Sequence, residues 1–214
     1  MLTKEQFIKA ITKARKEEDS RHKKRTFNQS IDLIVNLKDF DIKRTPMNLL
    51  VALPHKVKDK KVAAFLEKKS AIVDTITKDE FKSYEDKLKL KKLIKNYDFF
   101  IANAKLMPAV ATAFGRTLGP TGKMPSPQLG VLPPTEDEVA IKALLEKIDS
   151  VIKIRPKQPS IKVAIGKQDS SNEDIAENAY AVFNEIFKNL PKNRENLRSV
   201  LIKFTMGKPF KVEN

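Results

Sequence analysis

Hydrophobic and polar positions along the first quarter of the chain predict a helix followed by strands. A capping box formed by Thr3 and Gln6 precedes apolar residues at helical spacing, which predicts a helix to about Asp19. In residues 29–38, the apolar residues Ile31, Leu33, Val35 and Leu37 lie on one face and Ser30, Asp32, Asn36 and Lys38 on the other, as in a strand with one buried face. Residues 48–53 form a second, more continuously apolar strand that ends before a proline.

The last part of the chain has the same character. Residues 151–155 and 160–165 predict two strands of a hairpin around two prolines. A helix with one apolar face is expected to begin at Ser171, which provides its cap. Residues 198–206 alternate again and predict a final strand.

The middle of the chain follows a different pattern. Short apolar runs typical of buried parallel strands alternate there with helical segments. The expected strands are 62–66, 71–76 and 99–102, and the expected helices are 77–95, 106–114 and 135–148. This alternation favours a small α/β unit with a largely parallel sheet.

These patterns predict an α+β fold with two domains. Residues 1–57 and 152–214 would form one discontinuous α+β domain, domain I, from both ends of the chain. Residues 58–151 would form domain II, an inserted α/β, Rossmann-like domain.

A glycine- and proline-rich stretch, residues 115–127, holds three of the six glycines and three prolines. This density predicts a long, shaped loop, and its cations Arg116 and Lys123 suit an anion. A nucleotide-binding P-loop is excluded because Thr117 replaces the first glycine and Met124 follows the lysine. A phosphate backbone is the more plausible ligand.

Charge narrows the class of protein. Forty-two Lys and Arg against 27 Asp and Glu give a net charge of +15 and a pI near 9.8. Such a pI is typical of nucleic-acid-binding proteins, although a lysine-rich solubilising surface is the alternative. The absence of cysteine fits a cytosolic protein without disulfides. No apolar run is long enough for a membrane helix, and the amino terminus does not resemble a signal peptide.

No catalytic or metal-binding constellation is apparent. His22 and His55 lack partners at metal-ligand spacing, and no serine has the context of a nucleophile. We therefore expect a protein that is not an enzyme and that needs no cofactor or metal.

Residues 151–167 contain five cations and no acid, and on a strand Lys153 and Arg155 would share a face. The chain has no tryptophan, and most phenylalanines fall on core stripes, which disfavours recognition by base stacking. Two alternatives stay open. One is recognition of folded RNA by shape and phosphate contacts; the other is DNA binding, which no helix-turn-helix or zinc-finger spacing supports.

Four segments resemble ribosomal protein L1 of the large subunit, in its archaeal-like form. They are Phe27-Asn-Gln-Ser-Ile-Asp32, Leu53-Pro-His55, Gly115-Arg-Thr-Leu-Gly-Pro-Thr-Gly-Lys-Met-Pro125 and Phe204-Thr-Met-Gly207. The resemblance implies the two-domain L1 fold with domain II inserted into domain I. The chain departs from the usual family pattern at Thr26, Thr121 and Lys208.

The resemblance also implies a function and partners. The expected partner is the rRNA of the L1 stalk, beside the exit site for deacylated tRNA, whose release the protein would aid. The protein would also repress translation by binding its own mRNA. It would be a monomer when free, in the cytoplasm and on the large ribosomal subunit, without membrane contact. The alternative is a general RNA-binding regulator that is not stably ribosome-bound.

The resemblance and the charge pattern together predict the RNA-binding residues. They are Arg25, Phe27, Ser30, Asp32, Lys153, Arg155, Lys167, Ser199, Lys203, Thr205, Met206 and Gly207, with Arg116 and Lys123 as possible contacts in domain II. Small hydroxyls can meet ribose 2′-OH groups, and Gly207 would let RNA approach the backbone. The parity of Met206 with Phe204 favours a core position instead, so its RNA contact depends on the resemblance alone.

Overall fold

The computed structural model describes residues 2–20, 26–42, 44–84, 86–133 and 138–213. The chain forms two compact units. Unit 1 comprises Met1–Lys58 and Ser150–Asn214, and unit 2 comprises Asp59–Asp149. Helices combined with antiparallel and parallel sheets confirm the predicted α+β fold class. None of the described helices is long and apolar enough to cross a membrane.

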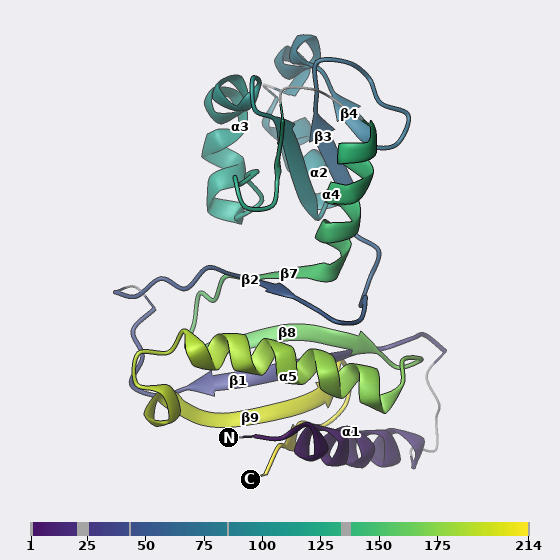
Figure 1. Cartoon of the computed structure of the whole chain (residues 1–214), viewed down its shortest axis with the longest axis vertical. Helices are drawn as coiled ribbons and strands as arrows, with labels where there is room; N and C mark the ends of the chain where they lie inside the picture. The colour runs from purple at the N-terminus through teal and green to yellow at the C-terminus, as the bar shows by residue number, and fades with distance from the viewer. Residues whose placement is uncertain (1, 21–25, 43, 85, 134–137, 214) are drawn as a thin grey trace. The chain divides into compact units, whose positions relative to one another are not determined.

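Unit 1 is built on a four-stranded antiparallel sheet in the order β10-β9-β1-β8. The strands are β1 (Ser30–Leu37), β8 (Ser160–Lys167), β9 (Leu197–Phe204) and β10 (Phe210–Lys211). The predicted alternation in β1 is confirmed, because every second residue from Ile31 to Leu37 is buried. Two helices, α1 (Lys4–Asp19) and α5 (Asn172–Lys188), lie side by side against this apolar face (Figure 1).

The amino-terminal ends of both helices carry the predicted caps. The Thr3 N–H donates to Gln6 Oε1 at 2.8 Å, and the Asp174 N–H donates to Ser171 Oγ at 3.1 Å. These bonds satisfy N–H groups that a helix leaves unpaired at its amino end. A short 3₁₀ helix, η2 (Asn193–Asn196), leads from the α5 side into β9.

The predicted hairpin over 151–165 is wrong. Strand β7 (Val151–Ile154) pairs with β2 (Leu49–Ala52) in a separate two-stranded sheet, whereas β8 pairs with β1. The connection between β7 and β8 contains two prolines, which donate no backbone N–H to a ladder. The two strands therefore diverge and join different sheets.

Unit 2 has a parallel sheet in the order β4-β3-β5-β6, as the alternating pattern predicts. The strands are β3 (Val62–Phe65), β4 (Asp74–Ile76), β5 (Phe99–Asn103) and β6 (Val131–Leu132). Helix α4 (Glu138–Ser150) packs on one face, and α2 (Lys87–Asn96) and α3 (Met107–Thr121) pack on the other. The 3₁₀ helix η1 (Lys78–Tyr84) lies on the α2 side.

Two expectations for the elements of unit 2 need correction, and a third is not tested. The helix predicted over 77–95 is divided into η1 and α2, because the Asp86 carboxylate accepts from the Leu88 N–H at 2.9 Å and starts a new helix. The strand predicted over 71–76 keeps only its last three residues. Thr135, predicted to begin α4, lies outside the described residues.

The glycine- and proline-rich stretch is not a long loop. Helix α3 continues to Thr121, and only then does Gly122, with a φ of 74°, end it in the left-handed conformation. The internal Pro120 lies in the last turn and has no N–H to donate to the carbonyl four residues earlier, but the helix continues past it by only one residue. The irregular part of this stretch therefore begins at Gly122.

Candidate nucleic-acid interface

Two of the four segments singled out in the sequence meet at one end of the unit 1 sheet. The Thr205 N–H and the Thr205 hydroxyl both donate to the Ser30 carbonyl oxygen, each at 3.0 Å. The beginning of β1 and the turn that follows β9 therefore lie against each other, although 175 positions separate them in sequence.

The turn 205–207 presents its side chains to solvent. Met206 is 59% exposed, so the core position that its parity favours is wrong; the strand ends at Phe204 and the alternation ends with it. The Gly207 N–H donates to the Phe204 carbonyl oxygen at 2.8 Å. A Cβ added at Gly207 would lie 3.1 Å from the Phe204 Cβ, so the tight turn itself favours glycine. Phe27 is also exposed, at 53%.

Charged side chains lie beside this turn. Lys167, at the end of β8, is in register with Ser30, and Lys203 of β9 is in register with Asp32 of β1. Burial raises the pKa of the Asp32 carboxyl, and the nearby Lys203 ammonium partly opposes this shift. We call this end of the sheet the sheet-end surface, formed by Phe27, Ser30, Asp32, Lys167, Lys203, Thr205, Met206 and Gly207.

Other predicted residues lie elsewhere in unit 1. Ser199 is six residues from Thr205 along β9, which corresponds to about 20 Å along a strand. Its hydroxyl accepts from Asn36 Nδ2 at 3.0 Å. Lys153 lies on β7, where burial and the neighbouring Arg155 lower its pKa. Arg25 lies outside the described residues.

The two candidate cations of unit 2 differ in their surroundings. Lys123 Nζ donates to the carbonyl oxygens of Ile94 and Tyr97, at 2.7 and 2.6 Å. The ammonium therefore satisfies carbonyls at the carboxyl end of α2. Arg116 is exposed on α3, within the segment predicted to be a loop.

A buried glutamine, which the sequence-based selection of site residues missed, supports the sheet-end surface. Gln29 is 1% exposed; its Nε2 donates to Glu18 Oε1 at 2.7 Å, and its Oε1 accepts from the Met206 N–H at 3.3 Å. The signal was present in the sequence, because Gln29 shares the parity of the buried residues of β1. A polar residue in a buried register requires partners, and here they lie on α1 and in the turn.

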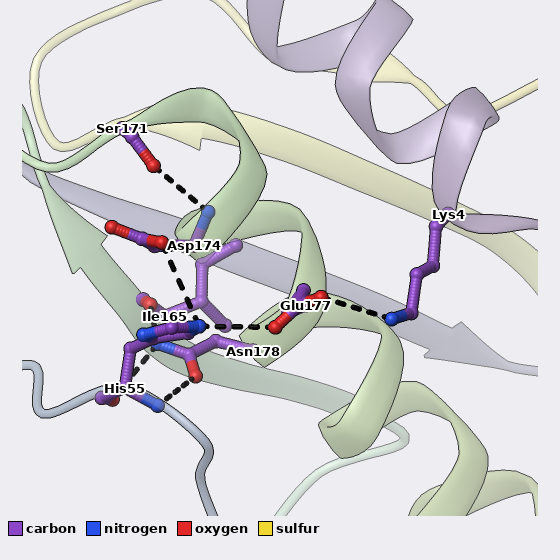
Figure 2. Close-up of polar contacts among 7 residues, drawn as sticks. All are labelled: Lys4, His55, Ile165, Ser171, Asp174, Glu177 and Asn178. Carbon is purple, nitrogen blue, oxygen red and sulfur yellow. Dashed lines mark hydrogen bonds and ion pairs between the residues drawn. The ribbon is translucent and has the colours of Figure 1, made fainter.

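His55 takes part in a polar cluster with three residues of α5, Asp174, Glu177 and Asn178 (Figure 2). Its Nε2 lies 3.0 Å from Glu177 Oε2 and 3.6 Å from Asp174 Oδ1, and Lys4 Nζ lies 3.0 Å from Glu177 Oε1. The Asn178 side chain bonds both the N–H and the carbonyl of His55. No group of three or more potential metal ligands occurs among the described residues. His22 lies outside them.

The fold and the surface define a class of protein: a basic, two-unit α+β protein whose antiparallel sheet ends in exposed hydroxyl and apolar side chains beside partly buried lysines, as in nucleic-acid-binding proteins. A family model described as "Ribosomal protein L1p/L10e family" matches residues 19–208. The chain belongs to this family.

Curated relatives agree, and each carries the name large ribosomal subunit protein uL1. The Thermofilum pendens protein is 42% identical, over 89% of this chain and 86% of the relative. The Pyrobaculum islandicum protein is 40% identical over 87% and 86%, and the Pyrococcus horikoshii protein is 39% identical over 95% of both chains. Members of the family are RNA-binding ribosomal proteins and not enzymes, which confirms the predicted family and the absence of an enzymatic role.

Proposed function

We propose that this protein is part of the large ribosomal subunit in the cytoplasm and binds the rRNA of the L1 stalk through the sheet-end surface. The observation that carries the proposal is the contact of Thr205 with Ser30, which brings two family motifs together at one exposed site. The rRNA binding that is general to the family supports this assignment. In this view unit 1 is the rRNA-binding domain I and unit 2 the inserted domain II.

The chemistry of the sheet-end surface suits folded RNA. The hydroxyl of Thr205 donates its hydrogen bond to the Ser30 carbonyl oxygen. Its oxygen lone pairs can still accept a hydrogen bond from a ribose 2′-OH. Phe27 and Met206 offer exposed apolar surface to bases and riboses. Lys167 can neutralise phosphate, whereas Asp32 suits a 2′-OH or a base donor because an acid repels phosphate.

Two further roles follow from the proposed site beside the exit path of deacylated tRNA. The protein would aid tRNA release, and it would repress translation by binding a stalk-like element in its own mRNA with the same surface. The cations Lys153 and Arg155, and Arg116 in unit 2, would extend the contact to neighbouring phosphates. A general RNA-binding regulator that does not reside on the ribosome is the alternative.

The first test compares binding to an L1-stalk rRNA fragment with binding to an unrelated hairpin of equal length over a salt series. Neutralising about 6–10 phosphates should cost about 10³–10⁵ in affinity between about 50 and 200 mM salt for either RNA. A preference for the stalk fragment that persists at high salt supports the proposal. Equal affinities that fall together with salt would refute specific recognition.

The location and the mRNA role need separate measurements. Sedimentation of cell extracts should place the protein with large subunits, whereas a free regulator would remain at the top of the gradient. If one surface serves both RNAs, the stalk fragment should displace a stalk-like element of the protein's mRNA competitively. Simultaneous binding of the two RNAs would contradict a shared surface.

A further inference from the structure

We propose that Glu18 and Gln29 are positioning residues for RNA recognition, holding the turn 205–207 in its binding conformation from beneath the sheet-end surface. This inference depends on the proposed function, because it assigns a support to the same surface. Both side chains are buried, at 8% and 1% exposure, so neither can be an RNA contact of any size.

The turn is held by three successive backbone N–H groups. The Thr205 N–H donates to the Ser30 carbonyl oxygen, and the Gly207 N–H donates to the Phe204 carbonyl oxygen. Between them, the Met206 N–H donates to a side chain, Gln29 Oε1, at 3.3 Å. The orientation of the exposed Met206 therefore depends on a side-chain amide, whereas its neighbours are held by backbone carbonyls.

The Glu18 carboxylate determines which way this amide points. An ionised carboxylate can only accept hydrogen bonds, and a backbone N–H can only donate them. Gln29 must therefore turn its Nε2 toward Glu18, at 2.7 Å, which leaves Oε1 for the Met206 N–H. Glu18 of helix α1 thereby determines that the oxygen of the Gln29 amide, and not its nitrogen, faces the Met206 N–H.

Gln29 also joins the third element of this surface. Its carbonyl oxygen accepts from the Gln168 N–H at 2.8 Å, directly after Lys167. One residue thus connects α1, the turn after β9 and the end of β8. A change at Gln29 should disturb the RNA-facing side chains together rather than one at a time.

The experiment exchanges the two groups. Gln29→Glu places two carboxylates in contact, and we expect it to weaken binding to the stalk rRNA fragment about tenfold, the ratio that about 1.4 kcal/mol produces. The double variant Glu18→Gln with Gln29→Glu restores an amide–carboxylate pair of reversed polarity. In the single variant, repulsion from Glu18 should displace the residue 29 carboxylate from the Met206 N–H. In the double variant, the amide at position 18 donates to this carboxylate and holds it in place, and the charge of the pair is the same as in the unmodified protein, so affinity should recover.

Hydrogen exchange of the Met206 amide, followed by NMR in the absence of RNA, provides the second measurement. Exchange should accelerate in Gln29→Glu and slow again in the double variant. Gln128→Glu, the same change at an exposed position in unit 2, should alter neither measurement. Thermal unfolding of each variant identifies one that fails to fold, in which case the double variant alone decides.

Two results would overturn the inference. One is a folded Gln29→Glu variant with unchanged affinity and unchanged Met206 exchange. The other is a folded double variant that binds RNA as poorly as Gln29→Glu. If the unmodified protein shows no preference for the stalk fragment, the proposed function fails, while the exchange measurement still tests whether the pair holds the turn.

Discussion

Replacing Thr205 with valine tests the sheet-end surface at a single atom. Valine keeps the shape of threonine and removes the hydroxyl that donates to the Ser30 carbonyl oxygen at 3.0 Å. That carbonyl retains the Thr205 N–H as a donor, also at 3.0 Å, so no buried acceptor is left unpaired. The loss in folding free energy should therefore be small, at or below about 0.5–1.5 kcal/mol, the usual net value of one hydrogen bond.

The effect on RNA binding should be larger than the effect on stability. A specific contact contributes about 1–3 kcal/mol, which corresponds to about a 5- to 150-fold weaker complex with the stalk fragment. Binding to an unrelated hairpin should remain the same, because the variant removes no charge. Equilibrium titrations of both RNAs and a thermal unfolding curve provide the necessary comparison.

Two controls separate the lost contact from general damage. Thr205→Ser keeps the hydroxyl and should bind as the unmodified protein does. Thr12→Val removes a similar hydroxyl, which donates to the Ile8 carbonyl oxygen on α1 at 2.8 Å, and should leave RNA affinity unchanged. If Thr205→Val bound the stalk fragment with undiminished affinity, the hydroxyl would not be an RNA contact and the reasoning for this surface would be refuted.

Three further predictions concern other parts of unit 1. Phe27→Ala should weaken stalk binding by about 1–3 kcal/mol with little change in the melting temperature, because the ring is more than half exposed; a matching loss of stability would show a packing role instead. Lys167→Gln should lower the slope of log affinity against log salt concentration by about 0.7–0.9, whereas Lys9→Gln on α1 should leave the slope unchanged. Equal slopes in RNA titrations of the two variants would contradict a phosphate contact by Lys167. Hydrogen bonds from His55 and from Lys4 lower the pKa of Glu177 from 4.5. The contribution of Glu177 to stability is therefore present above about pH 4.5 and is lost as the pH falls through the lowered pKa. The melting temperature of Glu177→Gln should depend less on pH in that acid range than the melting temperature of the unmodified protein.

Local patterns in the sequence predicted where the helices and strands lie better than they predicted which strands pair with one another. Strand β1 follows its alternation closely, because one face meets a helix layer and the other does not. The hairpin over 151–165 failed because strand pairing depends on residues far away: β8 joins β1, more than 120 positions earlier. No pattern confined to 151–165 could report which distant edge was available.

The same distinction applies to the sheet-end surface. Ser30 and Thr205 are found together because the family motifs that contain them meet where β1 and β9 pair, and Phe27 precedes Ser30 in the same motif. Ser199 lies on the same face of the sheet as Ser30. The alternation of a strand predicts only which face a residue is on and not how far along the strand it lies. Gln29 was overlooked, although a glutamine in a buried register indicates by itself a hydrogen-bonded role.

Strand β1 is central in its sheet, and this has a consequence for how the protein is made. Both of its neighbours, β8 and β9, follow unit 2 in the chain, so at synthesis β1 emerges long before either of them. Unit 2 is continuous in sequence and can complete its own sheet while β1 still has two open edges. The contact of Ser30 with Thr205 spans 175 positions and closes only when nearly the whole chain has left the ribosome. The surface that we assign to rRNA is thus assembled last, so a nascent or truncated chain would not compete with finished protein for RNA.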